Sequence, residues 1–356
     1  MLKASVPARN LTRPVNVGGV QIGGGAPVVV QSMTCTPTTD AEATLAQINA
    51  LVKAGCDIVR VSVPTAEAVE PFGRICSLSP VPIVADIHFD YRLAIAAVEH
   101  GASKLRINPG NIGSWDRVDA VIDAAGQAGA AIRIGVNAGS LDKDIASRED
   151  LTQVDKLVAS SMQFVDHFET RGFTDIVLSA KAHSVSTTLE TYRRLSSELP
   201  QIPLHLGVTE AGGIQQGTIK SSIALGALLA EGIGDTMRVS LTADPVEEVP
   251  VAWGILSALE LRRRGPEIVS CPTCARCQVD LIEIADEVTR RLASCTKPIT
   301  VAVMGCVVNG PGEASDADVG VACGRGSALL FRHGEAVRKV DESQIVDALI
   351  EEAEAL

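Results

Sequence analysis

Short apolar runs alternate with longer stretches of helical spacing through the first two thirds of the chain. Each run is rich in β-branched residues, as strands are, and precedes a stretch whose apolar positions recur every three or four residues, as in an amphipathic helix. Eight such runs are present, at residues 27–34, 58–63, 82–87, 104–108, 131–137, 175–181, 203–209 and 236–242. Eight strand–helix units in roughly 240 residues predict an α/β fold of the TIM (β/α)₈ barrel type. The alternative is an open doubly wound sheet, and the number eight favours closure.

Two flanking segments complete the fold prediction. Residues 14–25 alternate apolar and polar positions around glycines, which predicts a hairpin that closes the bottom of the barrel. After an eighth helix, expected over about 245–264, the sequence Arg262-Arg-Arg-Gly-Pro266 interrupts the pattern. We therefore expect two domains, residues 1–264 and 265–356.

The second domain is predicted to be small and of the α+β class. A helix is expected over residues 279–292 and a terminal helix from residue 341. Strands are expected at residues 299–304, 319–322, 328–332 and 336–340.

Composition narrows the function. The chain has 356 residues, of which 46% are hydrophobic, but its apolar stretches are strand-length and fall short of the roughly 20 residues that a membrane helix needs. A net charge of −12 and an aromatic content of 3% argue against nucleic acid as a partner. The N-terminus lacks an apolar signal core and nine cysteines is an odd number, so we expect a cytoplasmic protein rather than a secreted disulfide framework.

Polar residues interrupt the apolar runs near the carboxyl ends of the expected strands, which is where TIM barrels place their active sites. Most are spaced by two and therefore share one face of their strand. Four arginines and one lysine among them would repel one another in an apolar cavity, and an anionic ligand such as a phosphate or diphosphate ester would relieve that repulsion. The residues are Arg60, Ser62, Asp86, His88, Arg106, Asn108, Arg133, Asn137, Ser179, Lys181, Thr209, Glu210, Arg238 and Ser240.

Each of these residues also has a simpler interpretation. A single basic residue could form a salt bridge at a loop, but recurrence of the same type at four strand ends favours an anion site. Glu210 could neutralise an arginine or could donate a proton. Asp86 and His88 could position a ligand or could simply end the third strand, and the second interpretation is favoured.

The last quarter of the chain carries a candidate metal centre. Cys271-Pro-Thr-Cys274 offers two thiolates from one turn, and Gly305-Cys306-Val-Val-Asn-Gly-Pro-Gly-Glu313 offers a third thiolate and a carboxylate. Three thiolates with a weaker oxygen ligand would leave one iron open to a substrate. Cys277 permits a second arrangement, in which four thiolates close the cluster. A zinc ribbon is less favoured because a second Cys-x-x-Cys or His pair at a distance along the chain is missing.

These two cysteine motifs, together with residues 54–60 (Ala-Gly-Cys-Asp-Ile-Val-Arg) and 232–240 (Gly-Ile-Gly-Asp-Thr-Met-Arg-Val-Ser), make the chain resemble the GcpE or IspG family, the 4-hydroxy-3-methylbut-2-en-1-yl diphosphate synthases. The resemblance covers nearly the whole chain. It implies a TIM barrel followed by a domain like that of sulfite and nitrite reductases, which holds a [4Fe–4S] cluster. The implied cluster ligands are Cys271, Cys274, Cys306 and Glu313.

The resemblance also implies a reaction, the two-electron reductive ring opening of 2-C-methyl-D-erythritol 2,4-cyclodiphosphate in the non-mevalonate isoprenoid pathway. Ferredoxin or flavodoxin would donate the electrons, and a homodimer would place the cluster domain of one subunit over the barrel mouth of the other. Glu210 is implied as the catalytic acid. The implied diphosphate clamp is Arg60, Arg106, Arg133, Lys181, Arg238 and Ser240, and the implied positioning residues are Asn108, Asn137 and Thr209.

Two other hypotheses remain open at this point. A non-redox phosphate-ester lyase or synthase on a TIM barrel would use the second domain only as a structural metal site. A pure electron-transfer module would need no cationic barrel mouth.

Overall fold

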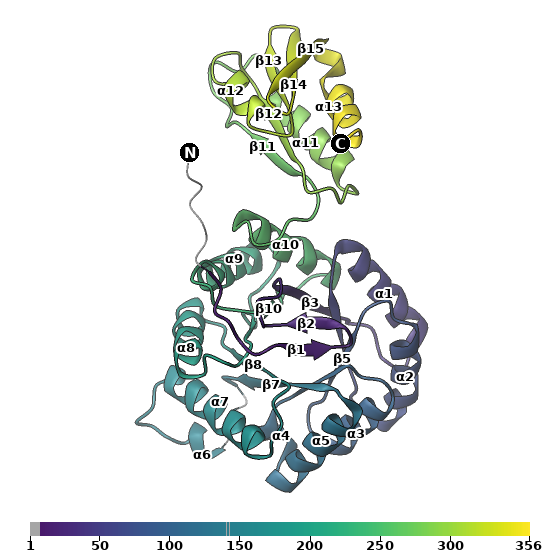
Figure 1. The fold of residues 1–356 in the computed structure, drawn as a ribbon, viewed down its shortest axis with the longest axis vertical. Helices are drawn as coiled ribbons and strands as arrows, with labels where there is room; N and C mark the ends of the chain where they lie inside the picture. Colours follow the sequence, from purple (N-terminus) through teal and green to yellow (C-terminus); the bar gives the residue numbers. More distant parts are fainter. Residues whose placement is uncertain (1–7, 140, 142) are drawn as a thin grey trace. The chain divides into compact units, whose positions relative to one another are not determined.

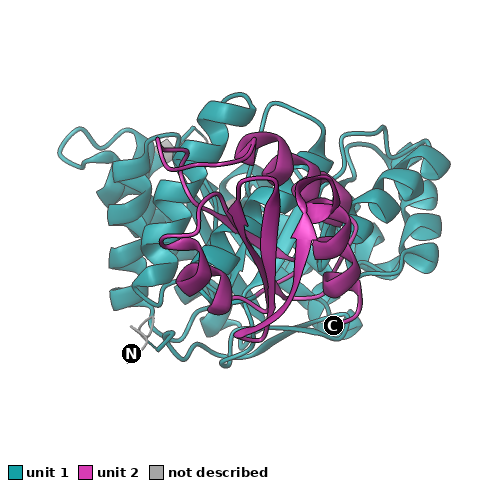
Figure 2. Ribbon diagram, turned by 90° about the horizontal axis from the view of Figure 1, so that it is seen from above, with its two compact units in different colours: residues 1–262 teal, residues 263–356 magenta. Residues whose placement is uncertain are grey.

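The structure is a computed structural model that describes residues 8–139, 141 and 143–356 (Figure 1). The chain divides into two compact units, Met1–Arg262 and Arg263–Leu356, shown in teal and magenta in Figure 2. None of the helices in the described residues is long and apolar enough to cross a membrane.

The first unit is a closed parallel barrel. Its eight-stranded sheet has the order β8-β7-β6-β5-β4-β3-β10-β9, and a parallel bridge between Leu178 and Leu204 joins β8 to the start of β9. The prediction of a TIM barrel is confirmed, and the open-sheet alternative is wrong. The strands are β3 Val29–Met33, β4 Ile58–Ser62, β5 Ile83–Asp86, β6 Lys104–Ile107, β7 Ala131–Asn137, β8 Ile176–Lys181, β9 His205–Leu206 and β10 Thr236–Met237.

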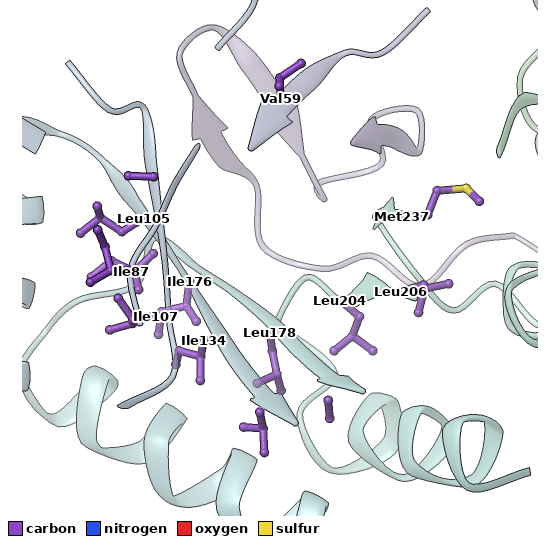
Figure 3. Close-up of a cluster of buried hydrophobic side chains, with 14 of the residues drawn as sticks. Val59, Ile87, Leu105, Ile107, Ile134, Ile176, Leu178, Leu204, Leu206 and Met237 are labelled. Carbon is purple, nitrogen blue, oxygen red and sulfur yellow. The ribbon is translucent and has the colours of Figure 1, made fainter. Parts of the chain in front are cut away.

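Helices surround this barrel and bury the outward-facing residues of the strands (Figure 1). Outward positions such as Val59, Leu105 and Leu178 alternate with inward ones and lie in the large apolar cluster drawn in Figure 3. The helices are α1 Ala41–Ala54, α2 Val69–Leu78, α3 Tyr91–Glu99, α4 Pro109–Ile112, α5 Trp115–Ala128, α6 Lys143–Ala146, α7 Gln153–Thr170, α8 Val185–Glu198, α9 Ile214–Ala230 and α10 Glu248–Ala258.

An N-terminal hairpin closes the bottom of the barrel, as the sequence predicts. Strands β1 (Val15–Val17) and β2 (Val20–Ile22) pair in antiparallel fashion, and their apolar side chains are fully buried except for that of Val20. They pack against residues near the beginnings of five barrel strands, namely Val29, Ile58, Val84, Ala131 and Val177.

The barrel interior becomes polar above this apolar floor. TIM barrels usually fill their interior with layers of Val, Ile and Leu. Here several inward positions below the mouth are polar or basic, and each is at most 1% exposed. They are Gln31, Lys104, Arg133, Ser179, His205 and Thr236. The polar layer leads directly to the carboxyl ends of the strands.

The second unit is the expected α+β domain. Its sheet follows chain order, with β11, β12 and β13 parallel and the last two pairs antiparallel. Helices α11 (Leu281–Leu292) and α13 (Ile345–Glu354) contribute to the apolar cluster on one face, and α12 (Gly310–Ser315) contributes Ala314 to the smaller cluster on the other. The strands are β11 Glu267–Ser270, β12 Thr300–Met304, β13 Val319–Gly324, β14 Ser327–Arg332 and β15 Glu335–Asp341.

Two elements of this unit differ from the prediction. Strand β11 is an edge strand with mostly exposed residues, so it lacks the apolar signal of a buried strand. Helix α12 begins in Asn309-Gly-Pro-Gly312, which resembles a turn, but proline is well tolerated in the first turn of a helix because the N–H there has no intrahelical partner.

Candidate functional site

Asp86 organises two arginines at the mouth of the barrel. Its carboxylate, at the end of β5, is 2% exposed and lies 3.3 Å from Arg106 Nη1 and 3.9 Å from Arg60 Nε. His88 Nε2 lies 3.7 Å from the same carboxylate. Burial raises the pKa of Asp86, but the charges of Arg60 and Arg106 outweigh burial and hold this pKa below its usual value. Asp86 therefore does more than end its strand, which corrects the favoured interpretation of the sequence.

Glu248 holds a third arginine. Arg238, just after β10, donates from Nε and Nη2 to the two carboxylate oxygens of Glu248, at 3.0 Å each. Glu248 also accepts from Ser32 Oγ at 2.8 Å and from the N–H of Leu241 at 3.2 Å. A carboxylate at the N-terminus of α10 is further stabilised by the helix dipole. The arrangement fixes the Arg238 guanidinium in one orientation.

Met33 lies between two of these arginines. Its sulfur accepts from Arg60 Nε and Nη2 at 3.1 and 2.9 Å, and Arg238 Nη1 lies 3.6 Å away. The thioether therefore brings the guanidinium groups of β4 and β10 to a common point at the mouth.

Arg133 and Lys181 have fewer partners. Arg133 Nη1 donates to Ser179 Oγ at 2.7 Å, but its Nε and Nη2 have no hydrogen-bond partner among the described residues. Lys181 is 7% exposed and lies beside Gly207, where an added Cβ would be 2.5 Å from Lys181 Nζ. Burial lowers the pKa of Lys181 well below its usual value, and the positive charge of Arg133 lowers it further.

The two predicted asparagines take different roles. The amide of Asn137, oriented to satisfy its hydrogen bonds, accepts from Arg106 Nη2 at 3.0 Å and donates to the carbonyl of Val136 at 3.2 Å. Asn108 is buried, and its side chain accepts from the N–H of Gly110 at 3.2 Å, which caps α4. Asn137 therefore supports the arginine cluster directly.

Thr209, Glu210 and Ser240 lie at the same strand ends as this cluster. Thr209 and Ser240 are half-buried and Glu210 is exposed. In the described part of the chain, no side-chain hydrogen bond or ion pair joins these three residues to the arginines. Glu210 has a backbone φ of 54°, a left-handed conformation that costs a residue with a Cβ roughly 1–2 kcal/mol. Such strain is concentrated at functional sites.

The second unit gathers three thiols around Arg276. Hydrogen bonds from the N–H groups of Asn309 and Val308 lower the pKa of the Cys306 thiol. Contacts with Arg276 lower the pKa of the exposed Cys274. The pKa of Arg276 rises in turn, chiefly through Cys274, with smaller contributions from Cys306 and Cys271. These shifts favour the thiolate form, which is the form that binds metals.

The three thiols do not form a site for a single metal ion in the described residues, where no three histidine, cysteine or acidic side chains are arranged to hold one. A single ion needs every thiolate about 2.3 Å from one point, whereas the thiolates of an iron–sulfur cluster bind different irons and lie further apart. Glu313 is exposed in the first turn of α12, and its side chain makes no hydrogen bond or ion pair with the residues that the structure describes, so the structure does not join it to the thiols.

Cys277 lies beside Gly305, as does Cys271, whose Sγ accepts from the N–H of Gly305 at 3.4 Å. The Sγ of Cys277 donates to the carbonyl of Val279 at 3.3 Å, and it packs at the border of the apolar core of the second unit. An added Cβ on Gly305 would lie 2.6 Å from this sulfur. Its surroundings are those of a small, partly buried apolar residue.

The fold and the site define a two-domain class of protein: a TIM barrel whose mouth is rich in basic side chains, followed by a smaller α+β domain with three neighbouring thiols. The model of the GcpE TIM-barrel domain matches residues 12–253, and that of the GcpE protein C-terminal domain matches residues 267–355. The chain belongs to the GcpE family.

Curated relatives agree with this assignment over nearly their whole length. A protein of Geobacter sulfurreducens named 4-hydroxy-3-methylbut-2-en-1-yl diphosphate synthase (flavodoxin) is 54% identical over 345 residues, which cover 97% of this chain and 98% of that protein. A protein of Clostridium perfringens with the same name is 52% identical and covers 98% of this chain and 99% of its own. Among solved structures, the Bacillus subtilis spore coat polysaccharide biosynthesis protein spsE has a TM-score of 0.51 at 12% identity, over 70% of this chain and 73% of its own, and shows the barrel fold alone.

Two residues of the barrel site and two buried residues beneath it were not predicted from the sequence. Met33 and Glu248 contact the predicted arginines, whereas Lys104 and His205 lie in the polar layer beneath them. The strand alternation carried a usable signal for Lys104, which is two residues before Arg106 on the same face of β6.

Proposed function

We propose that the chain catalyses the reductive ring opening of 2-C-methyl-D-erythritol 2,4-cyclodiphosphate to 4-hydroxy-3-methylbut-2-enyl diphosphate. The observation that carries the proposal is the excess of cations at the barrel mouth of a GcpE-family chain. Five basic side chains gather there against two buried carboxylates, Asp86 and Glu248. The basic residues are Arg60, Arg106, Arg133, Lys181 and Arg238.

Cations with and without a carboxylate partner would contribute differently to binding of the diphosphate. Asp86 and Glu248 fix three guanidinium groups before a ligand arrives, so that little ordering is needed on binding. Arg133 contributes donors without a protein partner, which suit bidentate contacts to phosphate oxygens. Lys181 adds a compact positive charge at the same place.

The remaining predicted residues would orient the substrate and move a proton. We assign Asn108, Asn137, Thr209 and Ser240 to positioning of the substrate. Glu210 is assigned as the acid that protonates the departing hydroxyl group, because its exposed carboxyl lies at the end of a barrel strand in a strained backbone conformation.

The second unit would hold the redox group. We assign Cys271, Cys274, Cys306 and Glu313 as ligands of a [4Fe–4S] cluster, on the basis of the gathered thiols and the family. When bound, the cluster would supply one at a time the two electrons that cleavage of the C–O bond consumes. The exposed carboxylate of Glu313 would be the ligand most easily displaced. The proposed electron donor is flavodoxin, which appears in the relatives' names, and ferredoxin is the alternative. The proposed assembly is a homodimer.

Iron and sulfide analysis with EPR tests this function. Protein purified without oxygen and reduced with dithionite is measured with and without the cyclic diphosphate. About four irons per chain, as a [4Fe–4S] cluster requires, and a signal that the substrate alters are expected. Zinc or no metal would instead support a non-redox phosphate-ester lyase or synthase with a structural metal domain.

A further inference from the structure

Three arginines of the barrel mouth have a carboxylate partner, whereas Arg133 and Lys181 have none among the described residues. Asp86 is shared by Arg60 and Arg106, and Glu248 is occupied by Arg238. In the residues that the structure describes, no carboxylate lies within ion-pair distance of Lys181 Nζ. The two acidic groups of the mouth are therefore already used by residues that carry a permanent charge.

Lys181 faces positive charge on several sides. Arg133 from β7 acts on it most strongly, followed by Arg60 from β4, Arg238 after β10 and Arg106 from β6. On the β9 side it lies beside Gly207 and near His205, whose pKa is lowered well below its usual value by burial and then by the charge of Arg133. Asp86 on β5 offsets part of this field, but its oxygens are engaged by two arginines.

The chemistry of arginine and lysine decides which of them loses a proton in a crowded cationic site. An arginine guanidinium stays protonated in proteins, whereas a buried lysine readily loses its proton. Repulsion in a crowded cationic site is therefore relieved at a lysine. Lys181 is 7% exposed, and its pKa is lowered first by burial and then by Arg133.

We propose that Lys181 is neutral before the substrate binds and takes up one proton when the cyclic diphosphate binds. The inference rests on the proposed function and deepens it. Each phosphorus of the cyclic diphosphate carries one strongly acidic hydroxyl, so the ligand arrives as a dianion with no proton to exchange near neutral pH. The proton therefore comes from the solvent to Lys181 Nζ, and no electrons move in this step.

Binding would depend on pH in a defined direction. The Lys181 pKa starts below its ordinary value and rises when two negative charges lie beside it. Between the two values the complex holds one more proton than the free protein, so affinity falls as pH rises through this window, by about tenfold per pH unit at most. Below both pKa values Lys181 is charged in either state and the dependence disappears.

Isothermal titration calorimetry of the oxidised full-length holoenzyme with the cyclic diphosphate measures the proton directly. Without a reductant the ligand is not turned over, and buffers with different ionisation enthalpies at one pH report the number of protons exchanged. For the unchanged chain we expect uptake that approaches one proton per site. Binding heat that does not depend on the buffer across the pH range would overturn the inference.

Three variants assign the proton to Lys181. Lys181→Arg keeps a charge that cannot titrate, so we expect binding without uptake, and Lys181→Met should bind more weakly and also without uptake. Lys104→Met is the matched control. Lys104 is a fully buried lysine that lies deeper in the barrel than Lys181, and its Nζ has no partner among the described residues. Uptake by this variant should match that of the unchanged chain. Uptake lost in Lys104→Met, or kept in Lys181→Arg, would overturn the assignment, whereas no binding at all by the unchanged chain would contradict the proposed function itself.

Discussion

The barrel mouth and the cysteine loops achieve order in different ways. At the mouth, Arg60 and Arg106 lie on strands inside a closed sheet and are held by Asp86. The thiols of Cys274 and Cys306 lie on loops of the second unit, and the atoms that steady them are mostly backbone N–H groups and one exposed arginine. The arginines of the mouth are therefore held by packing and ion pairs within the barrel, whereas the thiols depend on short loops whose geometry a bound cluster would complete.

Cys306→Ser should separate the two regions most sharply. A serine hydroxyl does not ionise at neutral pH, so one of three proposed thiolate ligands is lost. We expect loss of cluster iron, of visible absorbance and of all measurable turnover, while calorimetry shows unchanged affinity of the barrel for the cyclic diphosphate. A variant that keeps its iron would remove Cys306 from the ligand set.

Arg133→Met tests the barrel mouth, and here substrate binding rather than the cluster should be lost. Removal of a buried charge that contacts a charged ligand typically costs about 2–5 kcal/mol of binding free energy, so the affinity for the cyclic diphosphate should fall steeply. Thermal stability should not fall, because an apolar side chain replaces a buried cation with unsatisfied donors. Titration calorimetry and a melting curve measure both effects. Unchanged affinity would exclude Arg133 from the clamp.

Gly207→Ala tests whether close approach of the backbone just after β9 positions Lys181. The new Cβ would lie 2.5 Å from Lys181 Nζ and 3.0 Å from the carbonyl oxygen of Arg238. Overpacking of this kind costs about 1–3 kcal/mol, and we expect a rise in KM for the cyclic diphosphate. Gly226→Ala in α9 is the control, since its Cβ would meet no atom within 4 Å. An equal change of KM in both variants would contradict the role of Gly207.

Cys277→Ser should have the smallest effect. The Cys277 sulfur donates to Val279 and borders the apolar core, so we expect iron content and turnover to match those of the unchanged chain. Iron and sulfide analysis checks this expectation. Loss of the cluster in this variant would replace Glu313 by Cys277 as the fourth ligand.

The sequence predicted the barrel well because its alternation is strong. All eight expected barrel strands begin within two residues of the observed ones, and β7 (Ala131–Asn137) matches at both ends. Strands β9 and β10 have only two residues each and are shorter than the expected runs at residues 203–209 and 236–242. The rule that function lies at the carboxyl ends of barrel strands then selected Arg60, Arg106 and Arg133 without a structure.

The partners of those residues could not be predicted in the same way. Whether Glu248 reaches Arg238 depends on where α10 starts after β10, and whether Met33 lies between two arginines depends on the stagger of the strands. The polar interior at Lys104 and His205 was missed for a related reason. Alternation tells which residues point inward, but it does not tell what lies across the barrel from them.

The hairpin at the bottom of the barrel has a consequence for synthesis of the chain. Val17 and Ile22 complete their burial only when Ala131 and Val177 are present, and roughly 150 residues separate Ile22 from Val177. At about 5–20 residues per second, the ribosome needs roughly 8–30 s to make that stretch. For this time the hairpin carries apolar side chains without their partners, so nascent chains are exposed to association with chaperones and with one another until β8 emerges.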